Sequence, residues 1–572
     1  ANGLSIPNYF LSDCKSLTKV DIRTLEHITS IKNDFLSGCS SLKYPLLPDT
    51  AEEITIGDNF CSSCTTLTAS TFDFSKLNVK SIGDYFLSNC TGFTTLDLSE
   101  QLNKVTSIGS YFFSECTSLT ELNLNGLSNV VTINTNFLDG CGGLTTLDLS
   151  GLSSLKAIPA NFLYNCIKLE TLDLHGLTKI ESIAASFLDS CASLQTLDLS
   201  GLTSITDIPA NFLNGCIALQ SLDLSGLSSL ESISDNFLSG CGDLTELKLN
   251  NLTKVETIGQ AFLKNCTQLQ SLDLNGLTNV TTIANNFLDG LTNLTTLEMT
   301  GLTKVETISS YFLTGCTSLT SVDLSGWENV KSVGDYFLKG CTGIQTLDLN
   351  GLSKITSIPS HFLEDCSSLS SLQLNDWTKV DTIGINFLTG CSSLTSLELK
   401  NWTAVTQIPS NFLQNCTSVE TLDISGWTNV VTINDYFLSG CTSLVDLTLT
   451  GWTNLTTISN YFLQNCSDLV ELQLNNFAKL DTIGTNFLVG CSSLTTLELK
   501  NWTAMTQVPA NFLQNCTSLE TLDISGWENV VTINDYFLDG CTSLNDLTLT
   551  GWTNLTTIKN YFLLGCTGLA EL

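Results

Sequence analysis

Cysteine is the most reactive residue type in this sequence. Of the 23 cysteines, 22 occupy the same position of a sequence repeat that is 25 or 26 residues long. A spacing held this strictly over hundreds of residues fits neither a metal site nor a disulfide framework, in which cysteines cluster. Leu291 takes the place of cysteine in one repeat, so the position behaves as a small buried hydrophobe. We expect these cysteines to be reduced thiols in the core.

Only Cys61 lies outside this cysteine column, and with Cys64 it forms a Cys-x-x-Cys motif. A pair at this spacing can bind a metal or exchange disulfides. A zinc site, however, needs further ligands, and the sequence has no second Cys-x-x-Cys. The sequence therefore favours a local variation in an irregular repeat over metal or redox chemistry.

Carboxylates form a second column, because the residue between two leucines of each repeat is usually acidic. The alternating Leu-x-Leu pattern predicts that this residue faces outward from a strand. Strands lie about 4.8 Å apart, so like charges would stand opposite each other, which destabilises a sheet. Two interpretations stay open: a solvated face that resists edge aggregation, or weak binding of Ca²⁺ or a cationic partner. The candidate residues of this acidic column are Asp148, Asp173, Asp198, Asp223, Asp273, Asp323, Asp348, Asp423 and Asp523.

All eight tryptophans share another repeat position, where earlier repeats carry leucine, as at Leu152 and Leu177. Exchange of leucine for tryptophan predicts a mostly buried corner. The alternative is that the indole edges form a stacking platform for a sugar or a protein. The candidate residues of this aromatic column are Trp402, Trp427, Trp452, Trp502, Trp527 and Trp552.

Evidence for catalysis is almost absent from the sequence. His27, His175 and His361 fall at three different repeat positions, so no shared column could supply a general base. No glycine-rich phosphate loop follows a predicted strand. We therefore expect a non-enzymatic protein without a cofactor.

Composition limits the class of partner. The chain has 572 residues, 42% of them hydrophobic, and 56 acidic against 23 basic residues give a net charge of -33. This charge argues against nucleic acid or an anionic membrane as partner. No run of 18 apolar residues occurs, so we expect no membrane insertion. Ala1 opens the chain without a basic-then-apolar segment, so a leader has either been removed or never existed.

The elements that must position these columns are short. One repeat reads L-x-x-L-x-L-x-x-L-x-x-V-x-x-I-x-x-x-F-L-x-x-C-x-x, as in residues 144–168. Its opening leucines alternate as in a strand, and the Pro-x-x-Phe-Leu-x-x-Cys segment, which begins at Pro159, predicts a helical or 3₁₀ turn. Such units bury their apolar side only by stacking, which predicts an α/β solenoid with a parallel sheet on one face and short helical or 3₁₀ turns on the other.

The pattern resembles the leucine-rich repeats, and most closely the BspA-like (Treponema-type) class. That resemblance rests on the strand leucines, an isoleucine before a short turn, a phenylalanine and the following cysteine. The stretch LLPDTAEEITIGDNFCSSC, residues 46–64, matches best, while most other repeats are longer, with 25 residues. The resemblance covers the whole chain and implies an extracellular or cell-surface binding or adhesion protein without naming a ligand.

We therefore expect a single leucine-rich-repeat solenoid over residues 1–572, with about 23 repeats of 25 residues. Four repeats are duplicated near the C-terminus, because the text from Phe387 recurs from Phe487. The expected role is structural or adhesive, and the monotony of the repeats favours it over a soluble receptor that holds one protein or glycan ligand on its concave sheet.

Neither end of the sequence has an atypical capping repeat, so each is expected to expose core. Ala1 enters a repeat at its tenth position and Leu572 stops at its fourth, so one chain could complete a coil with the next. Such a contact does not close on itself and would propagate as a filament. The residues expected at this head-to-tail contact are Ile6, Phe10, Leu569 and Leu572. The alternative is a fragment whose caps belong to a longer protein.

Overall fold

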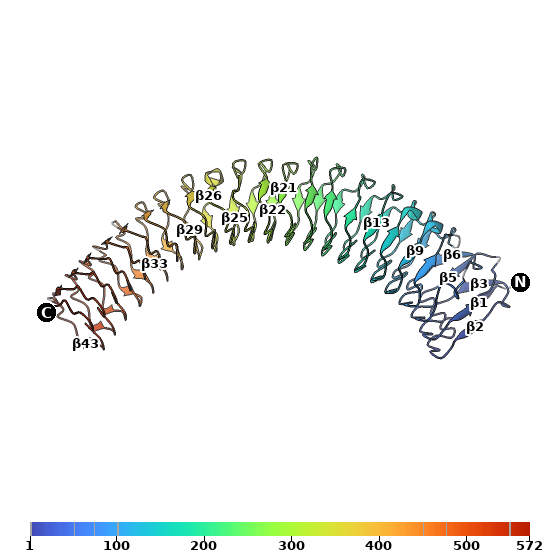
Figure 1. Cartoon of the computed structure of the whole chain (residues 1–572), viewed down its shortest axis with the longest axis horizontal. Coiled ribbons are helices and arrows are strands. Elements are labelled where there is room, and N and C mark those ends of the chain that lie inside the picture. The colour runs from blue at the N-terminus through green and yellow to red at the C-terminus, as the bar shows by residue number, and fades with distance from the viewer. Residues whose placement is uncertain are drawn as a thin grey trace. The chain divides into compact units, whose positions relative to one another are not determined.

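The computed structural model describes residues 3–50, 52–73, 75–99, 102–449, 451–475, 477–547, 549 and 551–572. The chain forms two compact units, which are described separately. Unit 1 comprises residues 1–280 and 296–301, and unit 2 comprises residues 281–295 and 302–572. Within each unit the repeats form coils that follow one another (Figure 1). The single continuous solenoid stays a prediction.

Most coils begin with a short strand, here called the A strand, which lies where the Leu-x-Leu pattern predicts it. The leucine at its centre is buried and the residues beside it face outward. Neighbouring A strands are parallel and in register, so that Leu147 pairs with Leu172 and Leu497 with Leu522. The A strands of unit 1 are β2 (Lys19–Asp21), β4 (Tyr44–Leu46), β7 (Thr95–Asp97), β9 (Glu121–Asn123), β11 (Thr146–Asp148), β13 (Thr171–Asp173), β15 (Thr196–Leu197), β17 (Ser221–Asp223), β19 (Glu246–Lys248), β21 (Ser271–Asp273) and β23 (Thr296–Glu298). Those of unit 2 are β26 (Thr346–Asp348), β28 (Ser371–Gln373), β30 (Ser396–Glu398), β32 (Thr421–Asp423), β34 (Asp446–Thr448), β36 (Glu471–Gln473), β38 (Thr496–Glu498), β40 (Thr521–Asp523) and β42 (Asp546–Leu547).

A second short strand, here called the B strand, follows in the same coil and was not predicted from the sequence. In most coils its last isoleucine or valine faces inward, and Ile433 pairs in register with Ile458. The B strands of unit 1 are β1 (Leu4–Ile6), β3 (Ile28–Ile31), β5 (Ile54–Ile56), β6 (Val79–Ile82), β8 (Ser107–Ile108), β10 (Thr132–Ile133), β12 (Ala157–Ile158), β14 (Ser182–Ile183), β16 (Asp207–Ile208), β18 (Ser232–Ile233) and β20 (Thr257–Ile258). Those of unit 2 are β22 (Thr282–Ile283), β24 (Thr307–Ile308), β25 (Ser332–Val333), β27 (Ser357–Ile358), β29 (Thr382–Ile383), β31 (Gln407–Ile408), β33 (Thr432–Ile433), β35 (Thr457–Ile458), β37 (Thr482–Ile483), β39 (Gln507–Val508), β41 (Thr532–Ile533) and β43 (Thr557–Ile558).

The core of each unit is built from columns of equivalent side chains. The phenylalanines stack from coil to coil, with ring centroids 5.2 Å apart for Phe60 and Phe86 and 5.1 Å apart for Phe462 and Phe487. Each coil buries its leucines and its phenylalanine against its neighbours. A single coil could not bury these faces alone, so stacking supplies the hydrophobic stabilisation.

The helical or 3₁₀ turn expected in the Pro-x-x-Phe-Leu-x-x-Cys segment was wrong. In residues 209–216, Asn211, Leu213 and Gly215 have positive φ angles of 58°, 59° and 71°. A left-handed residue at every second position cannot continue a right-handed helix. The N–H groups of Asn211 and Gly215 instead donate to Asp235 and Ser239 of the following coil, with N to O distances of 2.9 and 2.7 Å.

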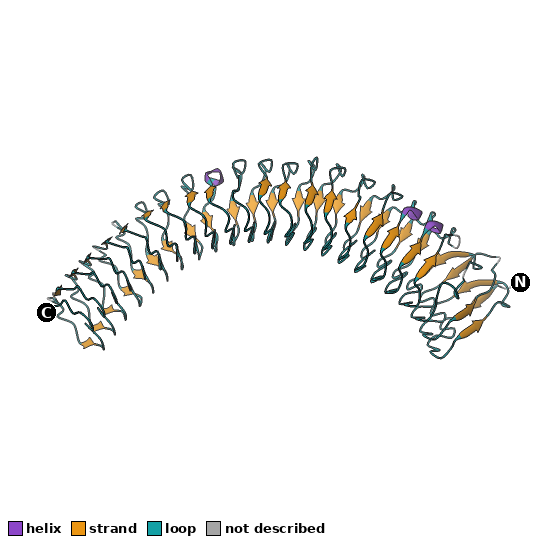
Figure 2. Ribbon diagram, in the orientation of Figure 1, coloured by secondary structure: helices purple, strands orange, loops and turns teal. Residues whose placement is uncertain are grey.

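The fold is therefore a parallel β-solenoid with almost no helix, rather than an α/β repeat. Helix occurs in the described residues only as three 3₁₀ turns, η1 (Asn125–Leu127), η2 (Ser150–Leu152) and η3 (Asn350–Leu352), each directly after an A strand (Figure 2). None of the helices in the described part of the chain has the length and apolar character that crossing a membrane requires.

Candidate binding surface

The acidic column lies on the outward side of the A strands, where Asp148 and Asp173 are exposed and paired in register. In every candidate aspartate, Oδ1 accepts the backbone N–H of the residue two positions later. The N to Oδ1 distance is 2.7 Å at Asp148, 2.8 Å at Asp198 and Asp223, 2.9 Å at Asp173, Asp273, Asp323 and Asp348, 3.0 Å at Asp523 and 3.1 Å at Asp423.

This hydrogen bond closes an Asx turn at the end of each A strand, which gives the aspartate a structural role. Asn123 occupies the same column and accepts the N–H of Asn125 at 3.1 Å, so the turn needs the side-chain oxygen and not the charge. Sequence analysis missed this role. The sequence feature that indicates this role is the replacement of aspartate by asparagine in the column, as at Asn123.

Local hydrogen bonds lower the pKa of some aspartates of the acidic column. The Ser225 hydroxyl and backbone N–H lower the pKa of Asp223. The backbone N–H and ring of His175 lower the pKa of Asp173, and the His175 ring is 2.6 Å from the Asp173 carboxylate. Hydrogen bonding to a carboxylate favours its charged form, so Asp173 and Asp223 carry negative charge at neutral pH.

A few lysines interrupt the ladder of like charge. The Nζ atom of Lys248 lies 3.3 Å from Glu246 and 3.8 Å from Asp223. In the duplicated repeats, Lys400 and Lys500 occupy the same repeat position as each other, directly after Leu399 and Leu499. Lys500 Nζ is 3.3 Å from both Glu498 and Asp523, and Lys400 lies near Asp423 in the same way. These side chains are exposed, so each ion pair contributes little, but together they relieve repulsion along the column.

No group of three or more histidine, cysteine, aspartate or glutamate side chains in the described residues is arranged to hold a metal ion. The aspartates of the acidic column stand in a row, and one oxygen of each is already committed to its turn. Weak cation binding by the column stays a prediction.

The aromatic column lies inside the coils. Trp402, Trp427, Trp452, Trp502 and Trp527 are at most 1% exposed, and Trp552 is partly exposed. Their rings stack from coil to coil, with centroids 6.1 Å apart for Trp402 and Trp427 and 5.8 Å apart for Trp502 and Trp527. A buried indole offers no face to a ligand, so the arrangement favours core packing over a stacking platform.

The indole N–H groups join successive coils. Nε1 of Trp427 donates to the Leu399 carbonyl at 2.8 Å, and Nε1 of Trp527 donates to the Leu499 carbonyl at 2.9 Å. Nε1 of Trp452 has no partner among the described residues. Its acceptor position, 28 residues earlier, holds Ile424 in place of a leucine.

The cysteine column is buried as predicted, with all its members but Cys14 and Cys566 fully inside. From Cys39 onward, each thiol of the column lies beside a backbone carbonyl of the preceding coil. The Sγ to O distance is 3.2 Å between Cys191 and Leu163 and 3.1 Å between Cys441 and Leu413. Desolvation raises the pKa of Cys191 to about 12. Cysteine therefore fills a small apolar site and adds a weak donor that leucine lacks.

An outward column of tyrosine and asparagine was missed by the sequence analysis. Side chains of the same type contact each other in this column. The ring centroids of Tyr436 and Tyr461 are 4.3 Å apart, and Nδ2 of Asn411 donates to Oδ1 of Asn386 at 2.6 Å. Tyr336 stacks at 4.2 Å on His361, whose Nδ1 is 2.6 Å from Glu364. Tyrosine recurs at this position in adjacent repeats, and that pairing was the available signal.

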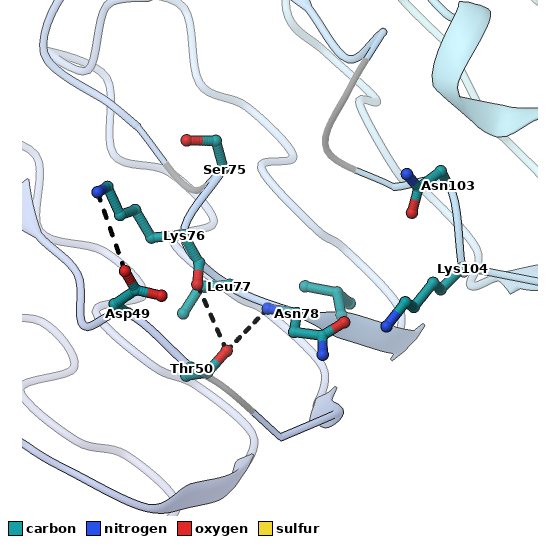
Figure 3. Close-up of a pocket in the computed structure, with 9 residues that line it drawn as sticks. Asp49, Thr50, Ser75, Lys76, Leu77, Asn78, Asn103 and Lys104 are labelled. Carbon is teal, nitrogen blue, oxygen red and sulfur yellow. Dashed lines mark hydrogen bonds and ion pairs between the residues drawn. The ribbon is translucent and has the colours of Figure 1, made fainter.

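A hollow of about 420 Å³ lies in unit 1, beside the loops that join A and B strands. Figure 3 shows the residues that line it. Lys76 reaches Asp49 at 4.0 Å, while Lys104 lies 3.7 Å from Glu53. Thr50 Oγ1 accepts the N–H of Asn78 at 2.7 Å. Because both lysines of this hollow face carboxylates, its attraction for an anion is weakened.

The hollow of about 660 Å³ on the B strands of unit 2 departs from the repeat pattern. Ile385 is 46% exposed at its rim, where other coils carry a small or polar residue. Asp381 and Gln407 line the same hollow. An apolar side chain thus interrupts the small and polar residues of this outward column.

The residues expected at a head-to-tail contact differ in exposure. Ile6 is 3% exposed, and Phe10 stacks on Phe35 with centroids 5.6 Å apart. Leu569 is partly exposed and Leu572 is 72% exposed. The contact itself stays a prediction.

Several solved structures are similar to this chain, and no curated protein matches it. A leucine-rich repeat protein from Bacteroides ovatus is 16% identical, covers 84% of this chain and 86% of its own, and has a TM-score of 0.35. The functional domain of InlJ from Listeria monocytogenes, described as including a cysteine ladder, is 18% identical, with 70% and 76% covered and a TM-score of 0.32. A leucine rich cell surface protein from Faecalibacterium prausnitzii is 16% identical, with 64% and 86% covered and a TM-score of 0.28.

The family model of the BspA type leucine rich repeat region matches six times, over residues 4–106, 100–220, 181–307, 281–417, 356–495 and 456–572. The matches cover nearly the whole chain. This chain belongs to the BspA type leucine-rich repeat family.

Proposed function

We propose that the protein is a non-enzymatic, extracellular or cell-surface protein with a structural or adhesive role, whose A strands present a repeated polar face to a protein or glycan. The observation that carries the proposal is the regular outward display. Coil after coil holds an aspartate in the same conformation through its Asx turn, as at Asp148 and Asp198. A repeated display suits a ligand that is itself extended or multivalent.

Charge selects the partner. The outward face of the A strands is acidic, and a net charge of -33 repels nucleic acid and anionic membranes. A protein with a basic surface, or a glycan that carries amino groups, complements it. Because such a contact is electrostatic, its association rate falls as salt rises.

The test uses a protein array and a glycan array probed with the whole chain. The variant replaces Asp148, Asp173, Asp198 and Asp223 by asparagine, which keeps the turn acceptor, as Asn123 shows, and removes four charges. The matched control removes four charges from the exposed B-strand side of the same unit, by Glu181→Gln, Asp207→Asn, Glu231→Gln and Glu256→Gln. We expect array signals that the first variant loses and the control keeps. Equal signals from both variants would contradict a role for the A strands.

A soluble receptor with one localised site is the second candidate, and the hollow around Ile385 favours it. That residue breaks the repeat pattern and is exposed, as a dedicated contact would be. Ile385→Ser restores the polar residue found in neighbouring coils. If the receptor proposal holds, this change removes the array signal while the fourfold asparagine variant retains it.

Filament formation by head-to-tail contact remains a further proposal. Its test is light scattering of the intact chain at high concentration, followed by electron microscopy. Fibres that Ile6→Asp and Leu569→Asp abolish would support it, and a monomer at high concentration would refute it.

A further inference from the structure

The Cys-x-x-Cys motif lies in the coil that follows β5. Cys61 stands where the neighbouring coils carry Leu36 and Leu87. The side chains of Cys61 and Cys64 are both 0% exposed. Both therefore point into the same small part of the core of unit 1.

The backbone brings the two residues within reach of each other. The N–H of Cys64 donates to the Cys61 carbonyl at 3.3 Å, which closes a turn between residues three apart. Turns of this kind hold their end Cα atoms less than about 7 Å apart, and most disulfides join Cα atoms separated by about 4.4–6.8 Å. The two thiols contact each other, and burial together with this contact raises the pKa of Cys61.

The other members of the cysteine column have no second cysteine in their own coil. A column thiol faces a leucine carbonyl of the preceding coil, as Cys64 faces Leu36 with an Sγ to O distance of 3.1 Å. Neighbouring column thiols do influence one another, and Cys341 contacts Cys316. They belong to different coils, however, and a bond between them would have to turn both thiols away from those carbonyls, whereas a bond between Cys61 and Cys64 turns only the Cys64 thiol away from its carbonyl.

We infer that Cys61 and Cys64 form a disulfide within one coil, which closes while that coil is open or folding. The reaction is exchange with a low-molecular-weight disulfide such as oxidised glutathione. One thiolate attacks that disulfide and releases one glutathione thiol, and the other protein thiolate then attacks the mixed disulfide and releases the second. Two S–H bonds of the protein are replaced by one S–S bond, and the two hydrogens leave on two glutathione thiols.

Burial decides when this reaction occurs. The glutathione adduct has no room in a core position that is 0% exposed, and the raised pKa of Cys61 keeps the native thiol protonated. Thiolates are the attacking species, so the exchange takes place while the coil is open or before it has folded. The closed disulfide is then protected by the same burial.

The test is refolding of the reduced chain in a mixture of oxidised and reduced glutathione, followed by alkylation under denaturing conditions. Trypsin cleaves after Lys43 and Lys76, and the peptide between these sites contains Cys61 and Cys64 and no other cysteine. We expect this peptide to resist alkylation and to be about 2 Da lighter than its reduced form. The other cysteines should be alkylated. Complete alkylation of this peptide, or disulfides between column neighbours such as Cys39 and Cys64, would overturn the inference.

Two variants control the experiment. Cys61→Leu restores the residue of the neighbouring coils and should leave every thiol open to alkylation. Leu213→Cys places a second Cys-x-x-Cys in a coil with the same turn, where the N–H of Cys216 donates to the Leu213 carbonyl at 3.3 Å. This variant should lose two more titratable thiols than the wild type. Retention of all of them after oxidative refolding would show that the turn alone does not bring two thiols together.

Discussion

The corner after the A strand is filled in two ways, with leucine in unit 1 and mostly with tryptophan in unit 2. Leu177 and Trp427 are both buried at equivalent positions. The leucine offers only apolar contact, whereas the indole also stacks on its neighbours and donates to a carbonyl of the preceding coil. One backbone thus tolerates two side chains of very different volume. The tryptophan coils gain a polar link, which makes their stacking more specific.

The largest expected effect is one that the two units share. Burial raises the pKa of Cys191 in unit 1 and of Cys441 in unit 2 to about 12. A thiol whose pKa is raised on folding stabilises the fold fully below its unfolded pKa of about 8.5, and this contribution is lost as pH rises toward 12. Each such thiol removes about 1.4 kcal/mol of unfolding free energy per pH unit in that window.

We therefore expect the reduced protein to unfold cooperatively in alkali, between pH 9 and 12, in both units. Circular dichroism across a pH titration measures this. Substitution of cysteines by leucine, which Leu291 shows to be accepted, should move the transition to higher pH. A fold unchanged at pH 12 would contradict the burial of ionisable thiols.

The next largest effect separates the two kinds of corner. Trp427→Ala should cost about 3–5 kcal/mol of unfolding free energy, near the upper end of such truncations, because it removes ring contacts and one of the two N–H donors to the Leu399 carbonyl. Leu177→Ala should cost less, about 2–4 kcal/mol. Urea unfolding followed by circular dichroism measures both. If Trp427→Ala lowers the unfolding free energy by no more than Leu177→Ala does, the tryptophan corner is no more stabilising than the leucine corner.

A smaller effect isolates the indole hydrogen bond. Phenylalanine keeps an aromatic ring and removes the N–H group, as Phe477 does naturally when it stacks on Trp502 at 6.3 Å. Trp427→Phe should cost about 1 kcal/mol more than Trp452→Phe, because Trp452 Nε1 has no partner among the described residues. Equal losses in urea unfolding would mean that the hydrogen bond adds nothing.

The smallest expected effect concerns the acidic column. Asp273→Ala removes the acceptor for the N–H of Asn275 and should cost about 0.5–1.5 kcal/mol, whereas Asp273→Asn keeps the turn and should be nearly neutral. Thermal unfolding of the pair compares them. If asparagine costs as much as alanine, then charge and not the turn selects aspartate.

The inward columns could be predicted from the sequence because each one repeats a single chemical character. Leucine for cysteine at Leu291 and tryptophan for leucine at Trp427 both indicated burial, and both residues are buried. The outward strand face followed from the Leu-x-Leu alternation. These inferences needed only periodicity.

Backbone hydrogen bonding between coils could not be predicted in the same way. In the turn at Asn211 and Leu213, apolar residues recur at every third position, and this spacing predicts a helical turn. Its N–H groups instead donate to carbonyls of a neighbouring coil, as that of Asn211 does to Asp235. The B strands are two residues long in most coils, too short for an alternating pattern to stand out. The Asx turn could not be predicted because the sequence shows the charge of an exposed aspartate but not the backbone N–H group that its side chain accepts.

Fluorescence quenching tests most directly the claim that the aromatic column is interior and leaves binding to the outward strand face. All eight tryptophans lie between Trp327 and Trp552, so their emission reports on this column alone. We predict blue-shifted emission with weak quenching by iodide and acrylamide, in which the partly exposed Trp552 is the main accessible fluorophore and Trp552→Phe removes the quenchable fraction. Strong quenching of most of the emission in the folded protein would contradict the account and restore the tryptophans as a binding platform.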